Sequence, residues 1–233
     1  RPSAGSTRPD IGADEIALVT NDAIAIGITN PANAVCENAT QSVDVIVGNN
    51  GIANITSVNV TVNVTGPVSA TLTGNYTGSL TTGQNTSINV GSINTTGGGQ
   101  FCFEIIAQLA GDGNTTNDTL VICQNIIPSV PVLISDTTCI NQSAYLTSVP
   151  AGGISWYDVP AGGSVLSTAD TFVTAPLVFQ TTFYAEVTAC GTTRYPVEAY
   201  VVIPSPVTIG NDTTICSTGS TVISAPANVT DFI

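Results

Sequence analysis

The sequence predicts an all-β protein made of tandem β-sandwich domains, and three observations support this. Short runs alternate apolar and polar residues, which is the period of a strand with one buried face. Gly, Asn and Pro cluster between these runs, as in turns. The apolar residues are mostly Val, Ile and Ala beside abundant Thr, a composition that favours pleated and half-buried surfaces.

The first predicted domain covers residues 16–127, after a polar segment at 1–15 that we interpret as the tail of an upstream domain. Val43, Val45 and Val47 share one face of a strand. A second strand carries Val58, Val60, Val62 and Val64 on its inner face. Further strands are expected at residues 87–90, 100–109 and 119–123. Short strands with turns between them are typical of a sandwich.

The second predicted domain covers residues 128–205 and follows a stiff junction that contains Pro128 and Pro131. Apolar residues again alternate at strand period, with Trp156 on the apolar phase of its strand. Trp156 is therefore expected to lie in the core, although an exposed Trp would suggest stacking on a sugar. Pro204 and Pro206 form a second junction.

An internal repeat indicates that a third module begins after this junction. The segment 136–139 (Asp-Thr-Thr-Cys) recurs 76 residues later as 212–216 (Asp-Thr-Thr-Ile-Cys), in each case after a Pro-rich junction. Residues 206–233 are then the incomplete start of another sandwich, too short to fold alone. We expect the natural polypeptide to continue past Ile233.

The six cysteines predict structural disulfides, because no His and no C-x-x-C pair is present to favour a metal site. Cys139 and Cys190 flank Trp156, an order that resembles the Cys…Trp…Cys pattern of immunoglobulin domains, and we expect them to bond. In the first domain we favour Cys102–Cys123, which leaves Cys36 free or bonded elsewhere. A Cys36–Cys123 bond is the alternative.

Composition argues against several classes of function. Only three Lys and Arg stand against 16 Asp and Glu, so nucleic acid is not an expected partner. The absence of His removes His-based nucleophilic catalysis, and no Gly-rich phosphate loop is present. No apolar run is long enough to cross a bilayer as a helix. We predict that the chain is not an enzyme and has no transmembrane segment.

One loop carries a candidate metal site. Asp112, Asn114, Asn117 and Asp118 lie close together in sequence and offer the oxygen ligands that Ca²⁺ prefers. The alternative is a polar hairpin loop whose Asn and Asp side chains bond to the local backbone. Apart from Ca²⁺ at this loop, no cofactor is expected.

Three stretches resemble modules of secreted Bacteroidetes proteins. Residues 8–15 resemble the closing segment of parallel β-helix domains. Residues 43–51, 78–83 and 109–119 look like a CARDB-type sandwich. Residues 155–158, 161–163, 181–186 and 190–191 are similar to the Ig-like repeats of gliding-motility-associated and other type IX-secreted surface proteins. The Ig-like resemblance extends over nearly the whole second domain.

The resemblance implies export across the outer membrane, attachment at the cell surface and glycosylation. Candidate O-glycosylation sites are Thr119, Thr137 and Thr213, each after or near an Asp. N-x-S/T sequons recur along the chain, and Asn59 and Asn63 are candidate N-glycosylation sites.

From these observations we expect a structural or adhesive segment of a large secreted surface protein or extracellular filament, with the tandem Ig-like modules acting as a stalk. Its expected partners are a glycan or protein ligand at the extracellular surface, or further copies in a filament. The alternative is an accessory carbohydrate-binding or spacer region of a secreted polysaccharide-active enzyme.

Overall fold

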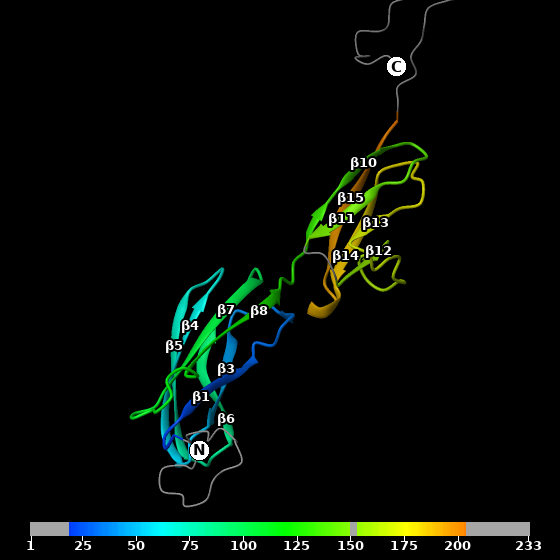
Figure 1. Ribbon diagram of the computed structural model, residues 1–233. Coiled ribbons are helices and arrows are strands. Elements are labelled where there is room, and N and C mark those ends of the chain that lie inside the picture. The colour runs from blue at the N-terminus through cyan, green and yellow to red at the C-terminus, as the bar shows by residue number, and fades with distance from the viewer. Residues whose placement is uncertain (1–18, 150–152, 204–233) are drawn as a thin grey trace, which may run out of the picture. The chain divides into compact units, whose positions relative to one another are not determined.

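The computed structural model describes residues 19–149 and 153–203, and these residues form an all-β protein (Figure 1). The β-sandwich class predicted from the sequence is confirmed. Among the described residues the single helical element is a 3₁₀ turn, η1 (Thr188–Cys190). Two compact units are present. The first comprises the described residues up to Pro131 together with Glu186–Arg194, and the second comprises the described residues of Val132–Ala185 and those from Tyr195 to Ile203.

The first unit is a sandwich of a five-stranded and a three-stranded sheet. The larger sheet has the order β2 (Val35–Cys36), β8 (Thr119–Ile127), β7 (Gly99–Gln108), β4 (Ile55–Thr65) and β5 (Ala70–Leu80). The smaller sheet has the order β1 (Ala23–Asn30), β3 (Gln41–Asn49) and β6 (Asn85–Ile93). Neighbouring strands are antiparallel, except that the short edge strand β2 pairs parallel to β8.

The core of the first unit lies between these sheets and is mainly aliphatic. The predicted inner faces are confirmed, since the valines of β3 and β4 at positions 43, 45, 47, 58, 60, 62 and 64 are at most 2% exposed. Phe101, Phe103 and Ile105 of β7 belong to the same core. Each buried side chain of this size contributes about 1.5–3 kcal/mol to folding, so the alternating valines are the main apolar contribution from the two strands.

The turn between β4 and β5 requires a glycine. Gly66 has φ +136°, and a Cβ at this position would lie 2.4 Å from the carbonyl oxygen of Gln100. Any other residue would strain the backbone and collide with β7. The first residue of the β4–β5 connection is therefore restricted to glycine.

The second unit is also built from two sheets. One has the order β10 (Asp136–Cys139), β15 (Arg194–Val202), β14 (Thr181–Val187) and β12 (Ile154–Tyr157). The other has the order β13 (Thr171–Val173), β11 (Tyr145–Val149) and β9 (Val132–Ile134). Strand β10 pairs parallel to β15, and Figure 1 shows the two running side by side.

An aromatic cluster fills the core of the second unit. Trp156 is fully buried, as predicted, and stacks on Phe172 with ring centroids 5.7 Å apart. Phe172 in turn meets Phe183 edge to face at 5.1 Å. The indole Nε1 of Trp156 donates to the carbonyl oxygen of Ala169 at 2.8 Å, which satisfies its only polar atom.

The disulfides correct one prediction. Cys102 and Cys123 lie opposite each other on β7 and β8 and are bonded, which is the pair favoured on the sequence. Cys190, however, bonds Cys36 and not Cys139, so the predicted Cys139–Cys190 bond is wrong and Cys139 is an exposed free thiol. The physical reason is that Cys190 lies in the segment Glu186–Arg194, which clusters with the first unit, whereas Cys139 lies on β10 opposite Val202.

Candidate functional site

The loop between β7 and β8 folds back on the chain that precedes β1. Asp112 organises the loop: its Oδ1 accepts from the amide of Asn114 at 2.8 Å, and its Oδ2 accepts from the amide of Ala23 at 2.8 Å. Gly113 donates its amide to the carbonyl oxygen of Asn21 at 2.8 Å. Both carboxylate oxygens of Asp112 therefore stabilise loop structure, as in the alternative interpretation of this sequence.

The centre of this region is Asp22, a residue that the sequence analysis missed. It is 1% exposed, and its carboxylate accepts from the side-chain amides of Asn117 at 2.8 Å and Asn50 at 2.8 Å. The amide of Asn114 lies 3.5 Å from the same carboxylate. The buried carboxylate of Asp22 is thus held by side-chain amide groups, and none of these bonds comes from a basic residue. Asp22 precedes Asn117 by 95 residues, so only the fold reveals that the two side chains are neighbours.

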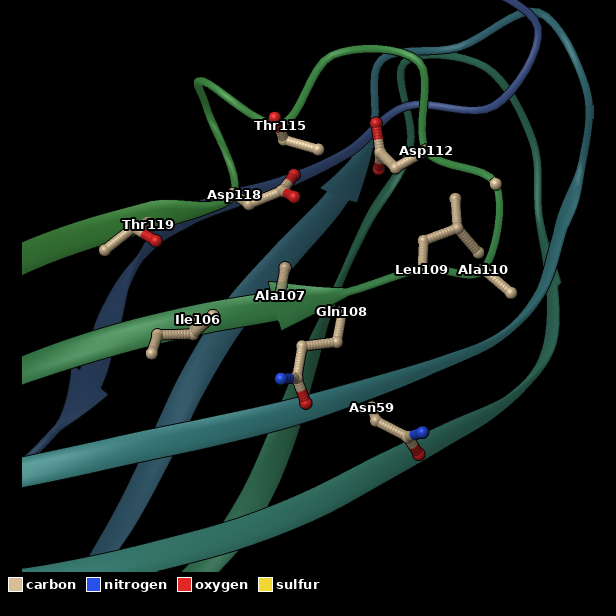
Figure 2. A pocket seen from close by; sticks show the side chains of 11 residues that line it. Asn59, Ile106, Ala107, Gln108, Leu109, Ala110, Asp112, Thr115, Asp118 and Thr119 are labelled. Carbon is tan, nitrogen blue, oxygen red and sulfur yellow. The ribbon is translucent and has the colours of Figure 1, made fainter.

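Two oxygens of this loop are buried without a hydrogen-bond partner, namely Oδ1 of Asn117 and Oδ1 of Asp118. Figure 2 shows the carboxyl groups of Asp118 and Asp112 on facing sides of the loop, with Thr115 between them along the chain. Burial raises the pKa of the Asp118 carboxyl, and the negative charges of Asp112 and Asp22 raise it further. The folded state therefore favours the protonated form of Asp118 more than the unfolded chain does.

The predicted calcium ligands come together only in part. Asp112, Asn114, Asn117 and Asp118 share one loop, but Asn117 directs its amide nitrogen toward Asp22, and Asp112 is occupied by backbone amides. Within the described ranges, no group of three or more His, Cys, Asp or Glu is arranged to hold a metal ion. Calcium binding at this loop stays a prediction.

A shallow polar hollow of about 680 Å³ lies beside the loop. Figure 2 shows its wall, which includes Asn59, Gln108, Thr115 and Asp118. The wall combines amide, hydroxyl and carboxyl groups with apolar side chains such as Ile106 and Leu109, and no aromatic ring lines it. The hollow can exchange hydrogen bonds with a polar molecule but offers no stacking surface.

Side chains on the outer face of the larger sheet form a cross-strand polar ladder. The amide of Asn75 donates to Oδ1 of Asn59 at 2.6 Å, and the amide of Asn63 donates to Oε2 of Glu104 at 2.8 Å. Thr71 adds a bond to Oδ1 of Asn63 at 3.1 Å. The candidate glycosylation residues Asn59 and Asn63 are thus both engaged within the sheet, and their modification stays a prediction.

The remaining candidate glycosylation sites lie elsewhere. Thr119 is exposed at the start of β8, and Thr137 is exposed on β10. Thr213 lies outside the described residues, as do the predicted upstream tail at 1–15 and the incomplete module at 206–233.

An exposed apolar surface covers one sheet of the second unit. Val132 and Val149 are direct cross-strand neighbours, and so are Tyr145 and Val173. Each is between 49% and 64% exposed, and Ile134 beside them is 50% exposed. Contiguous exposed apolar side chains often mark contact surfaces.

Comparison with known proteins agrees with the architecture of the second unit. Residues 128–202 match the family model described as an Ig-like domain, CHU_C associated. No curated protein sequence matches the chain. No helix within the described ranges is long and apolar enough to cross a bilayer.

Solved structures resemble the chain at low overall similarity. A domain of a cell surface protein from Methanosarcina acetivorans is 22% identical, with a TM-score of 0.38, and the match covers 47% of this chain and 94% of that domain. Red sea bream transglutaminase is 8% identical over 75% of this chain and 31% of its own, with a TM-score of 0.30. A chimeric titin Z1Z2 tandem is 10% identical over 76% of this chain and 100% of its own, with a TM-score of 0.21.

Proposed function

We propose that the chain is a structural segment of a secreted cell-surface protein, in which tandem Ig-like sandwiches act as a stalk or as part of an adhesive filament. The observation that carries the proposal is the Ig-like match at 128–202 directly after a second, separate sandwich. A succession of sandwiches spaces one part of a protein from another without any need for a catalytic site.

The disulfides support an extracellular location. Two bonds, Cys36–Cys190 and Cys102–Cys123, are formed within the described part of the chain. Disulfides persist in oxidising compartments, whereas cytosolic thiols are kept reduced. Export across an outer membrane by the type IX route, with attachment at the cell surface, is the form of this proposal that the resemblance of the second domain favours.

The outer faces support a spacer role more than a catalytic one. Their polar groups bond to one another across strands, as the pairs Asn75–Asn59 and Asn63–Glu104 show. On the larger sheet of the first unit, such a ladder stabilises the sheet and leaves few groups free to act on a substrate.

Labelling of intact cells tests the proposal. An antibody raised against this chain should bind cells that have not been permeabilised, and mechanical shearing should release the labelled polypeptide. Its mass and peptide sequences then identify what accompanies these modules. Labelling that appears only after permeabilisation would overturn the proposal. An attached catalytic domain that acts on polysaccharides would instead favour the accessory role in a secreted enzyme.

A further inference from the structure

Cys36 occupies a defined place in the first unit. It lies on the short edge strand β2, which runs parallel to β8, directly opposite Ile127, the last residue of β8. The amide of the next residue, Glu37, donates to the carbonyl oxygen of Ile127 at 2.9 Å. A proline, Pro128, follows β8 immediately.

Cys139 occupies the corresponding place in the second unit. It ends the short edge strand β10, which runs parallel to β15, directly opposite Val202, the last residue of β15. The amide of the next residue, Ile140, donates to the carbonyl oxygen of Val202 at 3.1 Å. Pro204 follows two residues after β15. The two cysteines therefore share strand direction, register, backbone bond and the junction that follows.

The disulfide of Cys36 shows which kind of cysteine bonds at this position. Its partner Cys190 lies in η1, in the connection from β14 to β15, and thus within the sequence that matches the Ig-like family. The Sγ of Cys190 lies 3.9 Å from the carbonyl oxygen of Ile127, the residue opposite Cys36. A cysteine beside the last strand of one sandwich thus bonds the η1 cysteine of the Ig-like sequence that comes next in the chain.

We propose that Cys139 is an attachment point, meaning that it forms the disulfide that corresponds to the Cys36–Cys190 bond. Its partner is the cysteine in the β14–β15 connection of another Ig-like module of the same kind. The proposal rests on the proposed function, because it needs tandem modules. Cys139 is exposed and unbonded, as an attachment point must be. Along an array, this bond would recur once for each module.

The chemistry is an ordinary thiol oxidation. The thiols of Cys139 and of the partner cysteine each lose a proton, and together they give two electrons to a disulfide oxidant, whose S–S bond breaks to two thiols while the new S–S bond forms. An oxidising compartment supplies this class of oxidant.

Cys216 is not the expected partner. In the sequence repeat it takes the position of Cys139, after the same Asp-Thr-Thr string and the same kind of junction. Cys216 is therefore predicted to correspond to Cys36 and Cys139, each of which would bond a cysteine from a β14–β15 connection. Neither Cys139 nor Cys216 lies in such a connection, so we do not expect them to bond each other.

Non-reduced peptide mapping of the polypeptide isolated from its natural source tests the proposal. The Cys139 peptide should be linked to a cysteine other than Cys36, Cys102, Cys123, Cys190 and Cys216, from a sequence that resembles residues 181–194. A free Cys139, a bond to Cys190 of the same chain, or a bond to Cys216 would overturn the proposal. A free Cys139 on a polypeptide that labels at the cell surface would still leave the proposed function standing.

A mixing experiment tests whether the position of Cys139 favours this disulfide. One chain carries Cys216→Ser, which leaves Cys139 as its free thiol. The second carries Cys36→Ser, Cys139→Ser and Cys216→Ser, which leaves Cys190 free. In a glutathione redox buffer we expect a Cys139–Cys190 heterodimer that disappears on reduction.

The matched control moves the thiol by two residues on the same strand. Thr137 is exposed on β10 like Cys139, so Thr137→Cys combined with Cys139→Ser and Cys216→Ser presents a thiol of similar access. The heterodimer should form several-fold faster with Cys139 than with this control. Equal rates would show that exposure alone decides the reaction and would overturn the proposal.

Discussion

The two units share a two-sheet plan but are stabilised by different interactions. The first has an aliphatic core of alternating valines and contains both disulfides. The second relies on the cluster of Trp156, Phe172 and Phe183, and its cysteine on β10 is unbonded. In the first unit, crosslinks restrict the unfolded chain, whereas in the second a few large rings supply the buried area.

This difference shows two solutions to one problem. A chain with 8% charged residues has little to gain from ion pairs, and a small sandwich buries a modest fraction of its surface. Disulfides in the first unit and aromatic packing in the second therefore add to the stability that aliphatic burial supplies. Changes that remove one source should therefore affect one unit and spare the other.

The largest effect is expected from the long-range disulfide of the first unit. Replacing Cys36 and Cys190 by Ser opens a loop whose ends are 154 residues apart, and the chain-entropy model gives a loss of about 5 kcal/mol. Replacing Cys102 and Cys123, which are 21 residues apart, should cost about 3 kcal/mol. Chemical denaturation of both variants measures the difference. Equal losses would show that loop length does not govern the contribution of these bonds.

The aromatic cluster should be the most sensitive part of the second unit. Trp156→Ala removes the ring that stacks on Phe172 and should destabilise this unit by about 3–5 kcal/mol. Phe103→Ala in the first unit has a similar expected cost, but in the other core. Hydrogen exchange, read separately for the strands of each unit, distinguishes the two. Loss of protection in both units from either change would contradict separate stabilisation.

Asp44 should link the stability of the first unit to pH. Burial raises its pKa, but hydrogen bonds from Asn89, Ser42 and Asn30 outweigh burial, so the pKa lies below its ordinary value. The stabilisation is therefore present above the unfolded pKa of 3.8 and is lost as pH falls through the lower folded value.

Asp44→Asn tests this linkage. It should cost about 1–2 kcal/mol at pH 7 and progressively less as the solution is acidified toward and below the folded pKa. Thermal unfolding at several pH values measures the change, and the exposed Asp158→Asn serves as a control. A cost that does not vary with pH would mean that the charge of Asp44 is not the cause.

The smallest effect, of opposite sign, is expected at Asp118. Because its pKa is raised, the folded state favours the protonated form, and this contribution is lost as pH rises through the folded value. Asp118→Asn should therefore stabilise the first unit at pH 7 by less than about 1 kcal/mol, and should have no effect at pH well below the ordinary Asp value.

The same variant tests calcium binding. If the loop binds Ca²⁺, the ion should raise the unfolding temperature of the unaltered protein and not that of Asp118→Asn. Thermal scans with Ca²⁺ and with a chelator make the comparison. Equal unfolding temperatures with and without Ca²⁺ in the unaltered protein would remove the calcium hypothesis.

Local sequence pattern predicted the strands well and long-range contacts poorly. The faces of Val43–Val47 and Val58–Val64 follow from a period of two residues, and so does the burial of Trp156. The bond between Cys36 and Cys190 does not, because cysteine spacing alone does not fix which distant cysteines pair. Asp22 was missed for a related reason, since its partners Asn50 and Asn117 belong to distant loops.

The scarcity of basic residues affects how readily trypsin-like proteases can cleave the chain. The chain contains no Lys and three Arg, and within residues 19–149 and 153–203 Arg194 is the single basic side chain. It begins β15 and pairs with Glu186 at 3.4 Å. A trypsin-like protease therefore finds one target in this part of the chain, and cleavage there requires the strand to open first.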